Sequence, residues 1–157
     1  MKAMLQIAGL LGMLVAGGLH AAGTQSPARQ IRAQWDDMQR AANAHDTDRF
    51  MASFAHGPDL VFAVNGEVIH GWNALRAQQL KWWNHGRSDA RYTQTGKLDL
   101  VALGSDAEVS TASFTSRRTG PDGKISIGRF VVTYIWKKLP QGWRIIHGHE
   151  SWARPSG

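Results

Sequence analysis

Cysteine is absent from the 157-residue sequence, which removes several kinds of chemistry at once. Without thiols the chain can form no disulfide bond, no cysteine-ligated zinc site and no cysteine nucleophile. Charged residues are also few, at 19%, whereas hydrophobic residues make up 43% and include 7 tryptophans and 5 phenylalanines. A disordered chain has the opposite balance, so length and composition together predict one globular domain.

Long runs of basic residues are missing as well, although 18 Lys and Arg residues oppose 12 Asp and Glu residues. The basic side chains are scattered, and the only adjacent pairs are Arg117-Arg118 and Lys137-Lys138. Nucleic-acid-binding proteins usually gather such residues into a patch or a stripe. We therefore expect an ordinary solvated basic surface and no nucleic-acid partner.

The N-terminus has the pattern of an export signal. Lys2 provides a basic start, residues 3–19 are uncharged and mainly apolar, and residues 19–23 include small side chains suited to cleavage. We expect residues 1–22 to be a signal peptide and residues 23–157 to be the folded domain, in the periplasm or secreted. No stable membrane insertion is expected after cleavage, and an uncleaved membrane tether is the alternative.

Signals for three helices come next. Ser26 can cap a helix that begins at Pro27, and apolar residues then recur at helical spacing: Ile31, Trp35, Met38 and Ala42. Asp46 can cap a second, short helix. Residues 71–84 show the apolar spacing of a third helix.

The remaining chain has the two-residue periodicity of strands. A hairpin is predicted around Asn65-Gly66, and four long alternating segments follow: residues 92–102, 107–118, 125–138 and 143–152. Helices followed by a meander of strands predict an α+β domain, with the helices covering one face of a strongly curved antiparallel sheet. A sheet curled around helices that do not fill it leaves a cavity, which is a common ligand site.

The last strand carries the most specific pattern in the sequence. Residues 142–151 read Gly-Trp-Arg-Ile-Ile-His-Gly-His-Glu-Ser, and Thr-Tyr-Ile-Trp stands at 133–136 in the strand before it. Together with the order of helices, hairpin and meander over residues 28–155, this pattern resembles the nuclear transport factor 2-like superfamily, in particular its SnoaL-like branch. That branch includes the association domain of calcium/calmodulin-dependent protein kinase II.

The resemblance implies a cone-shaped fold with three N-terminal helices, usually found as a homodimer. Members of the superfamily range from isomerases and dehydratases to binding and assembly domains, so the fold alone assigns no activity. In the ketosteroid isomerase branch, a carboxylate on the first strand moves a proton. Here the strand at 60–64 contains no acid, and Asp59 before it is expected to form a turn.

Tyr134 and Glu150 are the leading site candidates. Alternation places Tyr134 on one face with Phe130 and Trp136, and it places Glu150 with Trp152 on one face of the neighbouring strand. The resemblance implies that arginines occupy both positions in the kinase association domain and line a pocket for acidic ligands. A tyrosine and a glutamate favour hydroxylated, amine-bearing or cationic ligands instead. Three roles stay open for Glu150: general acid or base, ligand-orienting group, or partner in an ion pair.

Four further residues complete the candidate ligand-binding set: Trp35, Trp83, Phe62 and His70. Trp35 and Trp83 are expected to face the sheet, either in the core or at a cavity wall. His70 lies where the resemblance implies a cavity mouth, or alternatively at an exposed strand end. The adjacent Trp82 and Trp83 cannot both point inward from one helix, which leaves one of them for a partner chain or a mobile lid.

Two residue pairs on the later strands complete the analysis. His147 and His149 project from one strand face without a third ligand, so we expect neither a metal site nor a cofactor. Trp136 and Trp143 are expected to pack on a sheet surface that a homodimer covers.

The sequence as a whole favours an exported small-molecule-binding domain with an aromatic-lined cavity and no strong catalytic constellation. The alternative is a cofactor-independent lyase, isomerase or hydratase that uses Glu150 with Tyr134 or His70. A pure assembly domain is the third class.

Overall fold

The first helix of the computed structural model, α1 (Pro27–Ala44), starts where its capping residues predict. The Ser26 hydroxyl accepts a hydrogen bond from the Arg29 amide at 3.4 Å, and a proline opens the first turn. One face of the helix is buried: Ile31, Trp35, Met38, Ala41 and Ala42. The structure describes residues 25–153, so the predicted signal peptide lies outside the described residues.

Two shorter helices follow α1. The Asp46 carboxylate caps α2 (Thr47–Met51) by accepting a hydrogen bond from the Arg49 amide at 3.0 Å. Farther along the chain comes α3 (Trp72–Trp82), with the short 3-10 helix η1 (Asn84–Gly86) close behind it. The three predicted helices are therefore confirmed.

Seven strands form one sheet in the described part of the chain: β1 (Val61–Val64), β2 (Glu67–His70), β3 (Arg91–Gln94), β4 (Asp99–Ala102), β5 (Ala107–Thr119), β6 (Ile125–Leu139) and β7 (Gly142–Trp152). Their order is β2-β1-β7-β6-β5-β3, and β4 also pairs with β5. All neighbours are antiparallel except β1 and β7, which run parallel. The long connection between these two strands allows the parallel pairing, which a tight hairpin does not.

The segment predicted as one strand over residues 92–102 is divided in two. Both β3 and β4 pair with β5, β3 beside Phe114–Arg117 and β4 beside Glu108–Thr111. The break contains Gly96, and Leu98 turns into the core there. A single continuous strand was the wrong prediction because alternation does not reveal where a strand leaves its partner.

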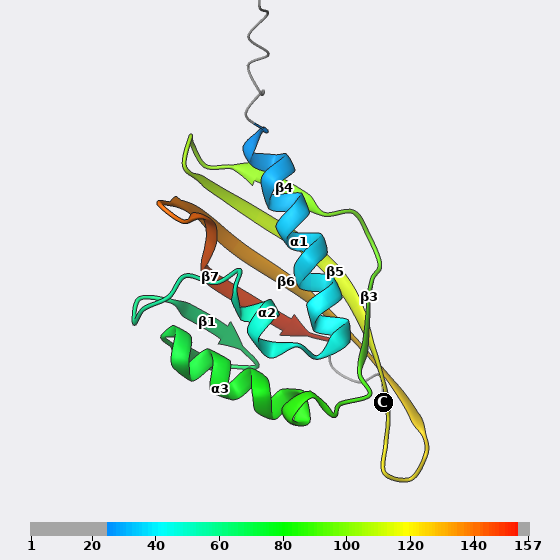
Figure 1. Ribbon diagram of the computed structural model, residues 1–157. Coiled ribbons are helices and arrows are strands. Elements are labelled where there is room, and N and C mark those ends of the chain that lie inside the picture. Colours follow the sequence, from blue (N-terminus) through cyan, green and yellow to red (C-terminus); the bar gives the residue numbers. More distant parts are fainter. Residues whose placement is uncertain (1–24, 154–157) are drawn as a thin grey trace, which may run out of the picture.

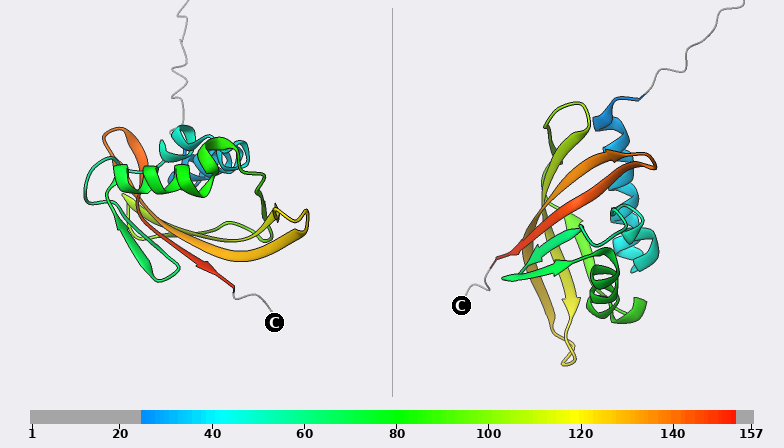
Figure 2. Two further views of the ribbon diagram at one scale, coloured as in Figure 1. Left: turned by 90° about the horizontal axis from the view of Figure 1, so that it is seen from below. Right: turned by 90° about the vertical axis from the view of Figure 1, so that its left-hand side faces the viewer.

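The helices lie together against one face of the sheet. Figure 1 shows α1 crossing the strands with α2 and α3 near its lower end, and both views of Figure 2 place the three helices on the same side of a curved sheet. This arrangement confirms the α+β fold with N-terminal helices on a curved sheet. Trp136 and Trp143 are 0% and 2% exposed and belong to the core between the two layers, so their predicted place on an outer sheet surface is wrong.

A β-bulge in β7 sets which side chains reach the inner face. Trp136 pairs with Ile145, whereas Ile135 pairs with His147, so one extra residue is inserted in β7. Trp143 is buried before the bulge. Strict alternation from Trp143 would send His149 inward, but the bulge shifts the phase, and the carboxylate of Glu150 faces inward instead.

Candidate functional site

A cavity of about 580 Å³ lies between the inner face of the sheet and the helices. Its volume falls within the range typical of small-molecule sites. Eight aromatic residues contribute to its wall: Phe50, Trp82, Trp83, Tyr92, Phe114, Phe130, Tyr134 and Trp152. The polar groups in the same wall therefore stand beside aromatic rings, where hydrogen bonds are stronger than in water.

Glu150 is the acidic residue of this wall. The Trp152 indole donates a hydrogen bond from Nε1 to Glu150 Oε1 at 2.5 Å. Burial raises the pKa of the Glu150 carboxyl, while that hydrogen bond and the positive charge of Arg118 act in the opposite direction. The net direction is upward, so this carboxyl holds its proton more readily than an exposed glutamate.

Trp152 is fixed from two sides. Its ring stacks on Phe130 with centroids 4.5 Å apart and an interplanar angle of 24°. It also covers Gly128, where a Cβ atom would lie only 2.7 Å from the Trp152 ring. The absence of a side chain at Gly128 therefore lets the indole lie where it can hold Glu150.

Tyr134 enters the cavity wall from β6 and is 4% exposed. Burial, together with the nearby negative charge of Glu150, raises the pKa of its hydroxyl, so the phenol stays protonated at neutral pH. Gly148 is the residue paired with Tyr134 on β7, and a Cβ atom there would lie 2.6 Å from the Phe62 ring. Gly148 thus makes room for both aromatic rings.

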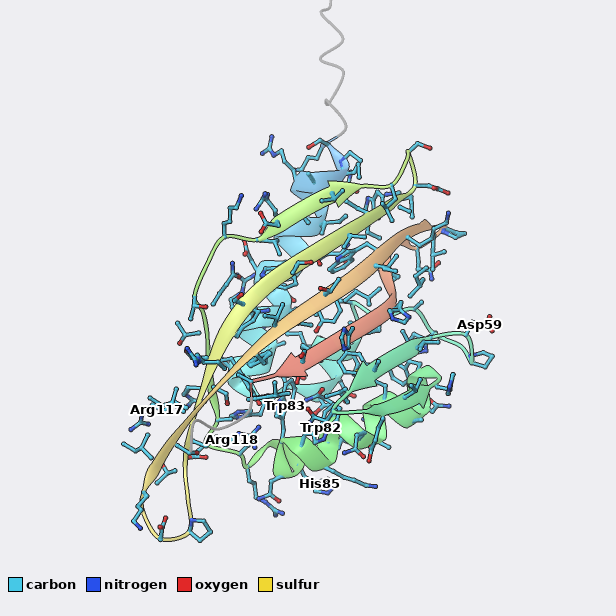
Figure 3. All side chains as sticks on the ribbon, turned by 180° about the vertical axis from the view of Figure 1, so that it is seen from behind. Asp59, Trp82, Trp83, His85, Arg117 and Arg118 are labelled. Atoms are coloured by element: carbon cyan, nitrogen blue, oxygen red, sulfur yellow. The ribbon has the colours of Figure 1, made fainter. Side chains whose placement is uncertain are left out.

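A second polar group in the wall was not singled out from the sequence. Tyr92 Oη accepts one hydrogen bond from Trp83 Nε1 at 3.0 Å and another from Arg118 Nη2 at 3.2 Å. The Ser116 hydroxyl also lines the cavity and is buried without a hydrogen-bond partner among the described residues. Figure 3 shows Trp83 and Arg118 near each other at the end of β7.

Strand periodicity was the available signal for this group. Phe114, Ser116 and Arg118 alternate along β5, so a buried Phe114 predicts that the other two share its face. The scattered basic residues instead predict an exposed Arg117-Arg118 pair. Arg117, its neighbour, is the exposed member of that pair.

The predicted ligand-binding residues divide into two sets. Tyr134, Glu150 and Trp83 come together in the cavity wall. The structure places the other three outside the wall: Trp35, Phe62 and His70. Trp35 and Phe62 are core residues, and Trp35 Nε1 donates to Gln94 Oε1 at 2.9 Å.

His70 is exposed where β2 ends, which agrees with the alternative of a surface residue at a strand end. Asp59 is also exposed, in the loop before β1, and Figure 3 shows it on the opposite side of the molecule from Arg118. Neither residue lines the cavity.

Trp82 and Trp83 both line the cavity, contrary to the prediction that one of them turns away. The helix ends at Trp82, and Trp83 has left the helical backbone conformation, with φ −96° and ψ 15°. The geometry of a continuous helix therefore does not apply to this pair.

Among residues 25–153, no three His, Cys, Asp or Glu side chains are grouped closely enough to hold a metal ion. None of the helices described there combines the length and apolar character that a membrane span requires.

This fold, with a cavity between helices and a curved sheet, is that of the nuclear transport factor 2-like superfamily. Residues 31–155 match the family model of the SnoaL-like domain, and the chain belongs to that family. No curated protein sequence matches the chain.

Solved structures with the same fold have little sequence identity to the chain. A nuclear transport factor 2-like protein from Salmonella enterica is 19% identical, with a TM-score of 0.69 over 82% of this chain and 92% of that one. A candidate calcium/calmodulin-dependent protein kinase II association domain from Xanthomonas campestris is 21% identical, with a TM-score of 0.65 over 85% and 95%. A ketosteroid isomerase-like protein from Erwinia carotovora is 18% identical, with a TM-score of 0.64 over 80% and 95%.

Proposed function

We propose that the protein binds a small organic molecule with an aromatic body and a hydrogen-bonding group directed at Glu150. The single observation that supports this most is a buried carboxyl in the wall of an aromatic cavity of about 580 Å³. Within the described residues, the only hydrogen bond that this carboxyl receives comes from Trp152. A buried acceptor with remaining capacity favours a ligand that brings a donor.

The neighbouring groups narrow the chemistry of that donor. Tyr134 stays protonated and offers an O–H group beside Glu150. A ligand hydroxyl can accept from Tyr134 and donate to Glu150 at the same time, while an amine can donate to the carboxylate. Hydroxylated or amine-bearing aromatic molecules therefore suit this end of the cavity.

The test is a fluorescence titration with phenols and aromatic amines, because Trp82, Trp83 and Trp152 line the cavity and report its occupation. Glu150→Gln should weaken binding about tenfold or more, as expected for loss of a charge-assisted hydrogen bond. Asp59→Asn is the matched control, since it neutralises an exposed carboxylate outside the cavity. Equal affinity in wild type and Glu150→Gln would contradict the proposal.

Proton transfer without a cofactor is the second candidate function. The observation that favours it is the raised pKa of Glu150 beside a protonated Tyr134, since catalytic acids and bases often have such shifted values. In this scheme the Glu150 carboxylate removes a proton from the ligand, and the Tyr134 hydroxyl donates a hydrogen bond to an oxygen that gains negative charge.

Deuterium exchange tests this second function. A bound phenolic ketone should exchange its C–H protons beside the carbonyl with solvent D₂O faster in the presence of the protein, as followed by NMR. Glu150→Gln should abolish that acceleration. Exchange that is as fast with Glu150→Gln as with wild type would exclude Glu150 as the base and leave only the binding function.

Two further properties belong to the proposal. The apolar run and small residues of positions 3–23 support export of the protein. The exposed apolar side chains on the outer face of the sheet, such as Val131, support a homodimer.

A further inference from the structure

Tyr92 has a hydroxyl proton that no described residue accepts. Its two hydrogen bonds come from an indole N–H and a guanidinium N–H, groups that can only donate. The phenolic oxygen is therefore the acceptor in both, and its own O–H remains as a donor. Because Tyr92 lines the cavity, the wall supplies this donor to whatever occupies the space.

Ser116 lies directly opposite Tyr92 in the pairing of β3 with β5. Side chains at such paired positions stand on the same face of a sheet, with Cβ atoms roughly 5 Å apart. The Ser116 hydroxyl is buried and has no partner in the described part of the chain. A second donor therefore stands beside that of Tyr92, and a buried hydroxyl left without a partner is costly.

Arg118 adds positive charge to these two hydroxyls. It is two residues beyond Ser116 on β5, so both side chains project from the same face, and both line the cavity. Among residues 25–153, Arg118 makes no ion pair within 4 Å. Its positive charge nevertheless acts to lower the pKa values of Asp89 and Glu150. A charged guanidinium with free N–H groups fits an anionic oxygen ligand.

We propose that Tyr92, Ser116 and Arg118 form a carboxylate-binding subsite, so that the ligand is an aromatic acid carrying a hydroxyl or amino group for Glu150. Trp83 is a positioning residue in this subsite, because its indole N–H donates to the Tyr92 oxygen and leaves the hydroxyl proton of Tyr92 available. This inference rests on the proposed binding function. The proposed acid-binding residues lie on β3 and β5. Positions 134 and 150, where the kinase association domain is expected to carry its arginines, lie on β6 and β7.

Matched pairs of probes can test the subsite: hydroxy- and amino-substituted benzoates, phenylacetates and phenylpropanoates, each with its methyl ester. The ester keeps the ring and the donor group but removes the negative charge. Wild type should bind the best acid about tenfold or more tightly than its ester, the size expected for charge-assisted hydrogen bonds. An acid that binds no better than its ester would overturn the subsite.

Variants assign the preference to residues. Arg118→Met should reduce the acid-to-ester ratio to about one, since it removes the charge-assisted contact. Tyr92→Phe and Ser116→Ala keep the shape of the wall and should each lower the ratio severalfold. Arg117→Met is the matched control, because this adjacent arginine is exposed, and it should leave the ratio unchanged.

The outcomes separate the subsite from the proposed function. Esters that bind and respond to Glu150→Gln, with acids no tighter, support the binding function and overturn the subsite. An undiminished ratio in Arg118→Met and in Tyr92→Phe, both shown by circular dichroism to be folded, also overturns it. If no acid or ester binds wild type, both the subsite and the proposed function fail for this class of ligand.

Discussion

The chemistry of individual residues in the cavity is set by their surroundings more than by their type. Glu150 and Tyr134 have raised pKa values because both are buried in an aromatic wall, and each charged form is poorly solvated there. Asp37 shows the opposite behaviour, since hydrogen bonds from Arg49 and Arg40 lower the pKa of its carboxyl at the surface. The carboxylate anion is therefore stabilised at the surface, at Asp37, and disfavoured in the cavity wall, at Glu150.

The raised pKa of Glu150 predicts a pH-dependent stability difference. The folded state binds this proton more tightly than the unfolded state, so the Glu150 contribution to stability falls as pH rises above its ordinary value of 4.5. Glu150→Gln cannot ionise and should be more stable than wild type at pH 8, with the difference shrinking toward pH 4.

Urea unfolding at a series of pH values measures this difference. Surface carboxyls such as Asp37 titrate in both proteins, so their contributions cancel in the comparison. A stability difference that does not change with pH would show that folding does not raise the pKa of Glu150.

At the scale of the elements, the bulge in β7 and Gly148 after it determine which side chains of this strand lie in the cavity wall. The bulge lies between Ile145 and His147, and it shifts the phase of the strand so that Glu150 faces inward. Gly148 has no side chain and so leaves room for the Phe62 ring. Two residues farther along the same strand, Glu150 lies in the cavity wall. Small local departures from a regular strand therefore build the site.

Gly148→Ala tests the second of these departures. The added Cβ would lie 2.6 Å from Phe62 and 3.1 Å from Tyr134, both buried rings that cannot move freely. We expect a loss of about 1–3 kcal/mol in the free energy of unfolding, as for other overpacked cores.

Gly96→Ala is the matched control for this substitution. A Cβ atom at Gly96 would meet nothing within 4 Å, and the backbone there is not in the left-handed region. Its effect should stay within about 0.5 kcal/mol. Denaturant unfolding of both variants measures the difference, and equal stability would show that the strand can shift to accept a side chain at Gly148.

The sheet has two faces with different surroundings. Helices cover the inner face, and the cavity lies between them and the strands, whereas the outer face is uncovered in the single chain. Val131 is 42% exposed on that outer face, between the inward residues Phe130 and Val132 of β6. Apolar exposure on a central strand favours association with a second copy.

The dimer proposal predicts twice the mass of one chain by size-exclusion chromatography with light scattering at micromolar concentration. Val131→Arg should shift the protein toward monomer, because a symmetric interface would bring two added charges together. Val68→Arg, an exposed position on the edge strand β2, is the control. A monomeric wild type would contradict the proposal.

The export proposal is tested with the full-length, unsubstituted chain. Expression in a bacterial host, followed by N-terminal sequencing of the periplasmic fraction, should give a chain beginning near residue 23, because residues 1–22 carry the signal pattern. A chain retained with its original Met1 would contradict a cleaved signal.

Local periodicity was sufficient to predict the helices, most strands and three residues of the candidate site, Tyr134, Glu150 and Trp83. Tyr134 and Glu150 were found because each alternates with apolar neighbours on strands whose inner face is buried. The same rule applied to β5 would have pointed to Ser116 and Arg118. Trp35 and Phe62 lie in the core and outside the wall. Periodicity could not decide between these two places, because it separates inward from outward side chains but not the core from a cavity.

The sequence by itself determined the helices, most of the strands, the inward face of β5 and β6 and the family, because these depend on residue types at short, regular spacing. Only the tertiary structure decided the polar group around Tyr92 in the cavity wall. Tyr92, Trp83 and Arg118 come from three separate segments and meet through hydrogen bonds between them. Their meeting depends on how the sheet curves, where β7 bulges and where α3 ends, and none of these follows from periodicity along the chain.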